Sequence, residues 1–422
     1  MVLKEKIHKL FNTGLFHIFG ASVFNNVIAF ISSIILVRVV SKADYGVFAY
    51  AWNIFSIVLL ASGFGTDAGA LQLLSESLND KQKFKRIFSA ALRFGSIFNL
   101  ILSFVMLIMG VFIPLPIMES GRLLVMMVIL PEFIYWYTMQ QIYLRSSMEN
   151  VKYSRTSLIN TALVAALTIV GALFWAAEGM VIGRYIAYIS SVVIGISIFR
   201  VPFIKLREKG LEKAVFKDLI KISGISMLNN GLSQLLYLID VFVIGIVMTD
   251  EIQVATYKVA TQIPTALSFI PVAIVTYIYP YFAAHREDRK WCIRKYRLTL
   301  LAVGSLNFVI SASLIILAPW LIRTIFGEQY MDALVPFRIL SASYFFSGTF
   351  SVLTGSLLVT QRKLYFNTFV AVLSGILNIA ADYVLVVLFE INGAAMATIS
   401  VVIITSILNV SYFVAVLVKK NK

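Results

Sequence analysis

The chain of 422 residues is poor in charged residues, histidine and cysteine. Charged residues make up 14% of it, whereas a soluble protein of this size carries about 25%. The single cysteine, Cys292, excludes an intrachain disulfide framework and a cysteine-based metal cluster. The three histidines, His8, His17 and His285, lie near the ends of apolar runs or in a loop. We therefore expect neither a metal site nor a cofactor.

Hydrophobic residues make up 59% of the chain and gather in long runs. A hydrocarbon core of about 30 Å needs about 20 apolar residues in a helix, and backbone groups in lipid must be satisfied within the helices themselves. The sequence therefore predicts an all-α integral membrane protein with twelve transmembrane helices. The predicted spans are roughly 18–40, 46–70, 87–112, 122–144, 155–177, 181–202, 222–247, 255–281, 297–325, 333–357, 365–389 and 393–417.

The basic residues indicate the orientation of these spans. If the N-terminus is inside, 28 of the 36 Lys and Arg residues fall in cytoplasmic segments, as the positive-inside rule requires. Both termini are therefore expected in the cytoplasm. The net charge of +15 is spread over the short loops between spans, so we do not expect nucleic acid as a partner.

The longest hydrophilic connection, residues 203–221, divides the spans into six plus six. We expect an N-terminal lobe of residues 1–204 and a C-terminal lobe of residues 205–422. Because six is even, both bundles have the same orientation and a pseudo-two-fold axis would run along the membrane normal. Two such bundles would leave a cleft in which a carrier alternately exposes a site to each side.

Ionisable residues inside spans are costly and usually face a cavity or a partner. Basic side chains would line a cavity for an anionic substrate, and acids would bind H⁺ or Na⁺ or hold the basic residues in place. The alternative is that the basic residues snorkel to the headgroups and the acids satisfy neighbouring helices. The candidate basic residues are Arg38, Lys258, Arg338 and Arg145, and the candidate acids are Asp240, Glu132, Asp67 and Asp382.

The segment SGFGTDAGALQLLSE, residues 62–76, is rich in glycine and carries Asp67. No strand precedes it, so a dinucleotide-binding loop is not expected. Gly65 and Gly69 have the small-xxx-small spacing that lets two helices approach closely. The segment therefore predicts a helix contact, and Asp67 is either a satisfied acid near a helix end or an acid that faces the cleft.

Two stretches resemble a known family. In residues 21–76 the segment VRVVSKADYGVFAYA ends a span at a basic residue and opens the next at Tyr-Gly, and in residues 355–400 a short basic loop precedes a last span that opens with Gly-Ala-Ala. Both are similar to the Wzx-type flippases of O-antigen and other polysaccharides, which belong to the multidrug/oligosaccharidyl-lipid/polysaccharide exporter superfamily.

The resemblance implies a substrate and a location. The substrate would be an undecaprenyl-diphosphate-linked oligosaccharide, moved from the inner to the outer leaflet of the bacterial inner membrane, with membrane lipids and the glycan polymerase machinery as partners. The family's cationic cavity role is carried onto Arg38 and Lys258. The chain has no Gly-x-x-x-x-Gly-Lys-Ser/Thr motif, so ATP is not the expected energy source. The energy source is then either an H⁺ or Na⁺ gradient or the consumption of the product downstream.

Two other functions fit the same pattern less well. An ion-coupled drug or metabolite antiporter of the same superfamily would share the fold but favour an acidic cavity. A membrane glycan polymerase or ligase would need a larger outer loop than the six to ten residues expected here. A purely structural role leaves the ionisable residues in several spans unexplained.

Overall fold

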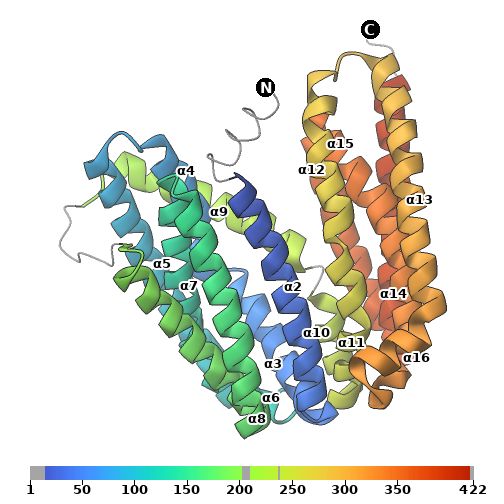
Figure 1. Ribbon diagram of the computed structural model, residues 1–422, viewed down its shortest axis with the longest axis horizontal. Helices are drawn as coiled ribbons and strands as arrows, with labels where there is room; N and C mark the ends of the chain where they lie inside the picture. The colour runs from blue at the N-terminus through green and yellow to red at the C-terminus, as the bar shows by residue number, and fades with distance from the viewer. Residues whose placement is uncertain (1–14, 202–209, 236–237, 419–422) are drawn as a thin grey trace, which may run out of the picture. The chain divides into compact units, whose positions relative to one another are not determined.

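The computed structural model describes residues 15–201, 210–235 and 238–418, and the regular structure in these ranges is helical. The two termini, for which a cytoplasmic location is expected, and part of the predicted connection 203–221 lie outside the described residues. The chain divides into two compact units, Met1–Gln234 and Leu235–Lys422 (Figure 1).

Unit 1 is built from long helices interrupted by short breaks. Helix α2 packs against α8, α4 packs against α5 and α7, and α3 packs against α6. The elements of this unit are α2 (Leu15–Val39), α3 (Lys42–Leu59), the 3₁₀ turn η1 (Ser62–Gly65), α4 (Thr66–Glu76), α5 (Lys81–Phe112), α6 (Ser120–Met126), α7 (Leu130–Ser146), α8 (Asn150–Ser197) and α9 (Lys213–Leu235).

Unit 2 is organised around its long last helix, which packs against α10, α14 and α15. The elements are α10 (Ile239–Met248), α11 (Glu251–Leu267), α12 (Phe269–Ala284), α13 (Arg289–Leu321), the π turn η2 (Ile322–Phe326), the 3₁₀ turn η3 (Glu328–Ala333), α14 (Leu334–Phe346), the π turn η4 (Ser347–Val352), α15 (Leu353–Thr360) and α16 (Leu364–Val418).

Among the described residues, eight helical stretches are long and apolar enough to cross a membrane. A ninth is added if α6 and α7, which are bent by 50° relative to each other, form one broken span. The Tyr185 hydroxyl holds this bend, because it donates to Met126 O at 2.8 Å and accepts from Ile129 N at 3.2 Å. The chain is thus a multi-pass, all-helical membrane protein.

Helices α8 and α16 each fold back on themselves. The backbone of α8 leaves the helical region at Trp175 and Ala176, and a Cβ on Gly183 would overlap Leu167 O. Sixteen residues of straight helix would separate these two positions by about 24 Å. Their contact means that the two arms of α8 lie side by side, as the green helices of Figure 1 show.

The reversal in α16 has the same form. Its backbone leaves the helical region at Phe389 and Glu390. A Cβ on Gly393 would overlap Leu385 O, although eight residues of straight helix span about 12 Å. Both reversals fall near the boundaries expected between spans 155–177 and 181–202, and between 365–389 and 393–417.

The span predicted over residues 46–70 is broken in its last third. Three consecutive residues, Gly63, Phe64 and Gly65, have left-handed φ values of 57°, 55° and 69°. The buried Asn99 side chain holds the break, since its Oδ1 accepts from Gly63 N at 2.7 Å and its Nδ2 donates to Pro131 O at 3.2 Å. A side chain from α5 thus bonds the backbone N–H of Gly63 in the break and also joins the break to Pro131 of α7.

The contact predicted at Gly65 and Gly69 is confirmed, with one correction. A Cβ on Gly65 would lie 2.6 Å from Ser223 O, and one on Gly69 would overlap the Ser223 side chain. Both glycines thus let α9 approach α4. Gly65, however, is the left-handed N-cap of α4 rather than a residue inside a helix, so its missing side chain serves the backbone conformation as well as the contact.

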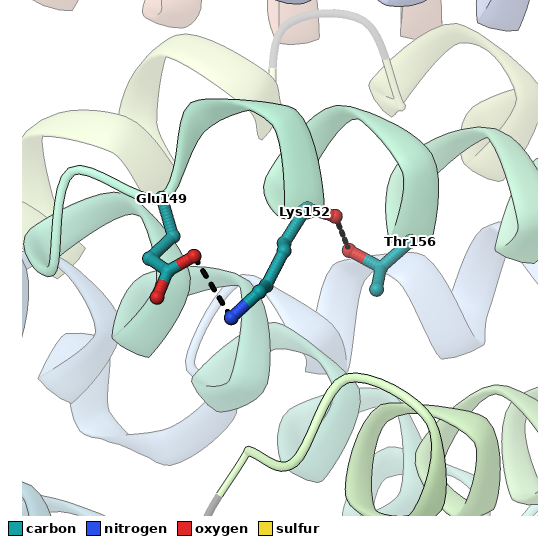
Figure 2. Close-up of polar contacts among 3 residues, drawn as sticks. All are labelled: Glu149, Lys152 and Thr156. Carbon is teal, nitrogen blue, oxygen red and sulfur yellow. Dashed lines mark hydrogen bonds and ion pairs between the residues drawn. The ribbon is translucent and has the colours of Figure 1, made fainter.

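The turn between α7 and α8 is fixed by polar contacts (Figure 2). Lys152 Nζ pairs with Glu149 Oε2 at 2.9 Å, and the Thr156 hydroxyl donates to Lys152 O at 2.9 Å. The same hydroxyl accepts from Gln141 Nε2 at 2.6 Å. This last bond ties the C-terminal half of α7 to the first arm of α8.

Candidate functional site

The most concentrated polar cluster lies inside unit 2. Asp240 and Asp382 are 9% and 0% exposed. Asp240 Oδ2 accepts from the Tyr257 hydroxyl at 2.5 Å and from the Thr398 hydroxyl at 2.7 Å. Asn378 Nδ2 bridges the two acids, at 3.1 Å from Asp382 Oδ2 and 3.5 Å from Asp240 Oδ1. We call these five residues the unit 2 acid cluster.

Four helical segments bring this cluster together. Asp240 lies in the first turn of α10, and Tyr257 lies in the middle of α11. Asn378 and Asp382 are one turn apart on the first arm of α16, and Thr398 lies on the second arm, beyond the reversal at Phe389 and Glu390. The fold-back of α16 is therefore what places a hydroxyl against the acid of α10.

The cluster holds two carboxylates and, among the described residues, no basic side chain within salt-bridge distance of either. Asp382 Oδ1 is buried and makes no hydrogen bond there. Lys258, next to Tyr257, is half-buried and within electrostatic range of Asp240. Two buried carboxylates with neutral donors around them can take up a proton or a small cation, because an unpaired buried charge is costly.

A second polar group lies inside unit 1, on the second arm of α8. The Arg184 guanidinium carbon is 3.8 Å from the centroid of the Trp52 ring and 5.5 Å from that of Phe48. The ring faces of α3 thus hold the guanidinium by a cation–π contact. Arg184 Nε is buried without a hydrogen-bond partner, and no described carboxylate pairs with this side chain.

The two predicted acids of unit 1 lie near the broken span. Glu132 is 6% exposed, and its Oε2 makes no hydrogen bond within the described residues. Asp67 is half-buried in the first turn of α4 and lines a cavity of about 230 Å³. Both acids are within electrostatic range of the buried Tyr135 hydroxyl.

The other predicted basic residues lie apart from these groups. Arg38 and Arg145 are exposed in the last turns of α2 and α7. Arg338 is exposed on α14 and donates from Nε to Ile315 O at 3.2 Å. Of the eight predicted site residues, three lie close together in unit 2. Asp240 and Asp382 share the Asn378 amide, and Lys258 is within electrostatic range of Asp240.

Sequence reasoning missed the residues that complete each group. Arg184 is not among the predicted basic residues, although it lies within a helix, about two turns beyond the reversal of α8. The usable signal was its position inside the predicted span 181–202. For Asn378 and Thr398 the sequence holds no comparable signal, because single amide and hydroxyl residues are common in membrane helices.

Comparison with known proteins assigns the chain to a family. The family described as "Polysaccharide biosynthesis protein" matches residues 35–335, whereas no curated protein sequence matches the chain. Among solved structures, the chain is similar to a multidrug resistance MATE family transporter of the MOP superfamily in its inward-facing conformation. The two are 13% identical over 93% of this chain and 95% of that one, with a TM-score of 0.74.

Two further structures have the same fold. The lipid II flippase MurJ, in an inward closed conformation, is 14% identical over 94% of this chain and 89% of its own, with a TM-score of 0.72. A MOP superfamily transporter from Pyrococcus furiosus is 13% identical over 95% and 96%, with a TM-score of 0.57. The chain therefore belongs to the polysaccharide biosynthesis protein family, and it has the fold of MOP superfamily transporters.

Proposed function

We propose that this chain is a flippase for an undecaprenyl-diphosphate-linked oligosaccharide. It moves the headgroup from the inner to the outer leaflet of the bacterial inner membrane by alternating access of a cationic cavity, and delivers it to the polymerisation machinery. A diphosphate carrying sugars cannot cross about 30 Å of hydrocarbon unaided. The polyprenyl tail stays in lipid, so the protein has to shield only the polar head.

The observation that carries this proposal is Arg184. Its guanidinium is stacked on Trp52 at 3.8 Å, and no described carboxylate neutralises it. A guanidinium held by its face keeps its N–H edge for a ligand, and that edge matches two oxygens of a phosphate. A permanently charged group kept inside a membrane lobe without an acid partner fits an anionic substrate.

The fold-backs support the twelve-span arrangement. If each arm of α8 and of α16 crosses the membrane, if α6 with α7 forms one broken span, and if the predicted span 222–247 counts as one crossing, the chain has twelve crossings. With twelve crossings, the basic residues of the connecting segments favour an orientation with both termini in the cytoplasm.

The unit 2 acid cluster supports coupling to a cation. Asp240 and Asp382 share the amide of Asn378, and no described basic side chain lies within salt-bridge distance of either. A proton or a Na⁺ ion bound there would remove the cost of two buried negative charges. Binding and release of that ion would bias one conformation over the other. The effect is measured as dependence of translocation on a pH or Na⁺ gradient.

Deleting the gene and locating the lipid-linked glycan tests the proposal. The intermediate is expected to accumulate on the inner leaflet. There it is protected from a membrane-impermeant reagent that oxidises glycans and is applied from outside. Wild-type protein restores access. Arg184→Gln is expected to restore about a tenth or less, because a charge-assisted pair contributes about 1.5–3 kcal/mol, and Arg184→Lys restores an intermediate amount.

Arg323→Gln is the matched control, because Arg323 is 65% exposed and pairs with the exposed Glu328 at 2.9 Å. It removes an arginine of the same chain and is expected to complement fully, since such surface pairs contribute little. Normal translocation in the deletion strain, with unpolymerised glycan outside, would overturn the flippase proposal.

The second candidate is an ion-coupled drug or metabolite antiporter. The specific observation in its favour is the similarity to the MATE transporter together with the paired acids of unit 2. Cells that overproduce the protein would then extrude an organic cation such as ethidium in a Na⁺- or pH-dependent way. Extrusion by wild type that Asp382→Asn abolishes, with glycan export unchanged in the deletion strain, would favour this function.

A further inference from the structure

The cavity beside Asp67 in unit 1 is a product of the broken span. Ser62 and Gly65 of the break line it, together with Asp67, Thr138 of α7 and Asn230 of α9. Its volume of about 230 Å³ is more than ten times the about 15 Å³ that one water needs. It therefore has room for a ligand the size of a sugar ring, and its volume is far larger than a single dehydrated monovalent ion would need.

The shape of this cavity is built into the packing. Gly63 presses against the Tyr135 ring, where a Cβ would overlap it. The hydroxyls of Thr66 and Tyr135 lie 2.6 Å apart and reach the carbonyl oxygens of Gly63 and Ala91, each at 2.8 Å. The break is thus tied to α5 and α7, and the cavity that it opens is part of the fold.

The lining offers hydrogen-bond acceptors. The Thr138 hydroxyl donates to Ile134 O at 2.9 Å, and the Ser62 hydroxyl donates to Asn99 Oδ1 at 3.3 Å. Both oxygens therefore face a ligand as acceptors. Asp67 accepts backbone N–H groups of the first turn of α4, and no described basic side chain pairs with it. The remaining lone pairs of these oxygens, with the Asn230 amide, are the polar groups available to a ligand.

This lining excludes the diphosphate as the occupant. A phosphate is an acceptor and an anion, whereas the cavity presents acceptors and a carboxylate, and among the described residues its lining contains no Lys or Arg. A sugar ring carries a hydroxyl donor on most carbons, and a carboxylate and a carboxamide can each bond two neighbouring hydroxyls. The partly exposed Leu60, Ile134 and Met227 in the lining supply an apolar surface beside these groups.

We propose that this cavity binds one uncharged sugar unit of the transported glycan, with Asp67 and Asn230 reading its hydroxyls. The inference rests on the proposed flippase function and deepens it. Within unit 1, recognition is divided. Arg184 and Trp52 take the anionic part of the substrate, and the Asp67 cavity takes a sugar that carries no carboxylate. Specificity among glycans is then set at the break of the second span.

Binding to purified protein in lipid nanodiscs tests this division with two probes. One probe is undecaprenyl diphosphate without sugar. The other is the oligosaccharide released by mild acid from the lipid-linked intermediate of the deletion strain, freed of phosphate. Asp67→Asn is expected to weaken oligosaccharide binding about ten- to hundredfold and to leave undecaprenyl diphosphate binding unchanged. Arg184→Gln is expected to do the reverse.

Glu76→Gln is the matched control, since it removes an exposed acid from the same helix, α4, outside the cavity. Asn230→Ala, at an exposed position, tests the same cavity if Asp67→Asn fails to fold, and is expected to weaken oligosaccharide binding about tenfold. Unchanged oligosaccharide affinity in both cavity variants overturns the sugar site.

Two further outcomes separate this inference from the proposed function. If Asp67→Asn weakens the binding of Na⁺ and leaves the binding of both probes unchanged, the cavity is a cation site and the inference is wrong. If wild type binds neither probe, the flippase proposal itself fails. If wild type binds both probes and the cavity variants bind both equally well, the flippase proposal stands and only the sugar site is rejected.

Discussion

At the scale of single residues, the ionisable side chains fall into two groups. The ion pairs Arg122–Glu178, Arg323–Glu328 and Lys152–Glu149 are at least partly exposed, where such pairs contribute about 0–1 kcal/mol. Asp382, Glu132 and Arg184 instead have buried polar atoms without hydrogen-bond partners in the described part of the chain. Because an unsatisfied buried group costs about 1–3 kcal/mol, each of these side chains lowers the stability of the fold.

Asp382→Asn is therefore expected to weaken the response of the protein to Na⁺ and to protons. Wild type should gain thermal stability when Na⁺ or protons saturate the unit 2 acid cluster, by about 2.7 kcal/mol at a hundredfold excess over Kd. The variant removes one of the two carboxylates, so its melting temperature in detergent should change less with NaCl and pH than that of wild type. Melting scans over both variables measure this.

Glu287→Gln is the control variant, because it removes an acid whose side chain is 86% exposed. It should keep the wild-type ion response. If the wild-type melting temperature is the same at every NaCl concentration and pH tested, the cluster is not the coupling site.

At the scale of the elements, glycine contacts decide how the long helices fold. In α8, a Cβ on Gly171 would overlap Gly179 O, and one on Gly179 would overlap Gly171 O. The arms can lie side by side only because neither residue has a side chain. The second arm carries Arg184 to Trp52, so the geometry of the proposed anion site depends on this contact.

Gly179→Ala is expected to lower stability by about 1–3 kcal/mol, since an added methyl group in a packed contact must displace backbone. The melting temperature of the detergent-solubilised protein measures the loss. Gly20→Ala is the control, because no atom lies within 4 Å of a Cβ on Gly20 in α2. That substitution should be neutral or slightly stabilising, as alanine in a helix is favoured over glycine by about 1 kcal/mol. Equal stability of the two variants would show that the arms are not held by the glycine contact.

At the scale of the whole molecule, orientation follows from the distribution of charge over the connecting segments. The loop at Met118 carries little basic charge, whereas the one at Met148 lies between Arg145 and Lys152. Both methionines are well exposed, at 92% and 64%. Cys292 is buried and is the chain's single cysteine, which makes cysteine mapping practicable.

In a Cys292→Ser background, Met118→Cys should react with a membrane-impermeant maleimide added to intact cells, and Met148→Cys should react only after permeabilisation. The reason is that positively charged loops are retained in the cytoplasm. The unsubstituted Cys292→Ser protein is the blank. Labelling of Met148→Cys from outside would reverse the proposed orientation.

The sequence by itself determined the class of this protein and much of its element order. Apolar runs of about 20 residues can satisfy their backbone in lipid only as helices, and the two reversals lie near the expected span boundaries. Asp240, Asp382 and Lys258 could be named as candidates because ionisable residues stand out against apolar ones.

Only the tertiary structure decided which of these residues meet. Asp240 lies 158 positions from Thr398 and 138 from Asn378, and contacts between such distant residues leave no periodic pattern along the chain. The break at Gly63, Phe64 and Gly65 left no such pattern either, because the contacts that hold it are made by Gly63 with Asn99 and Tyr135, which lie on other helices. The local chemistry of the helices set the elements, and the packing between distant helices set the sites.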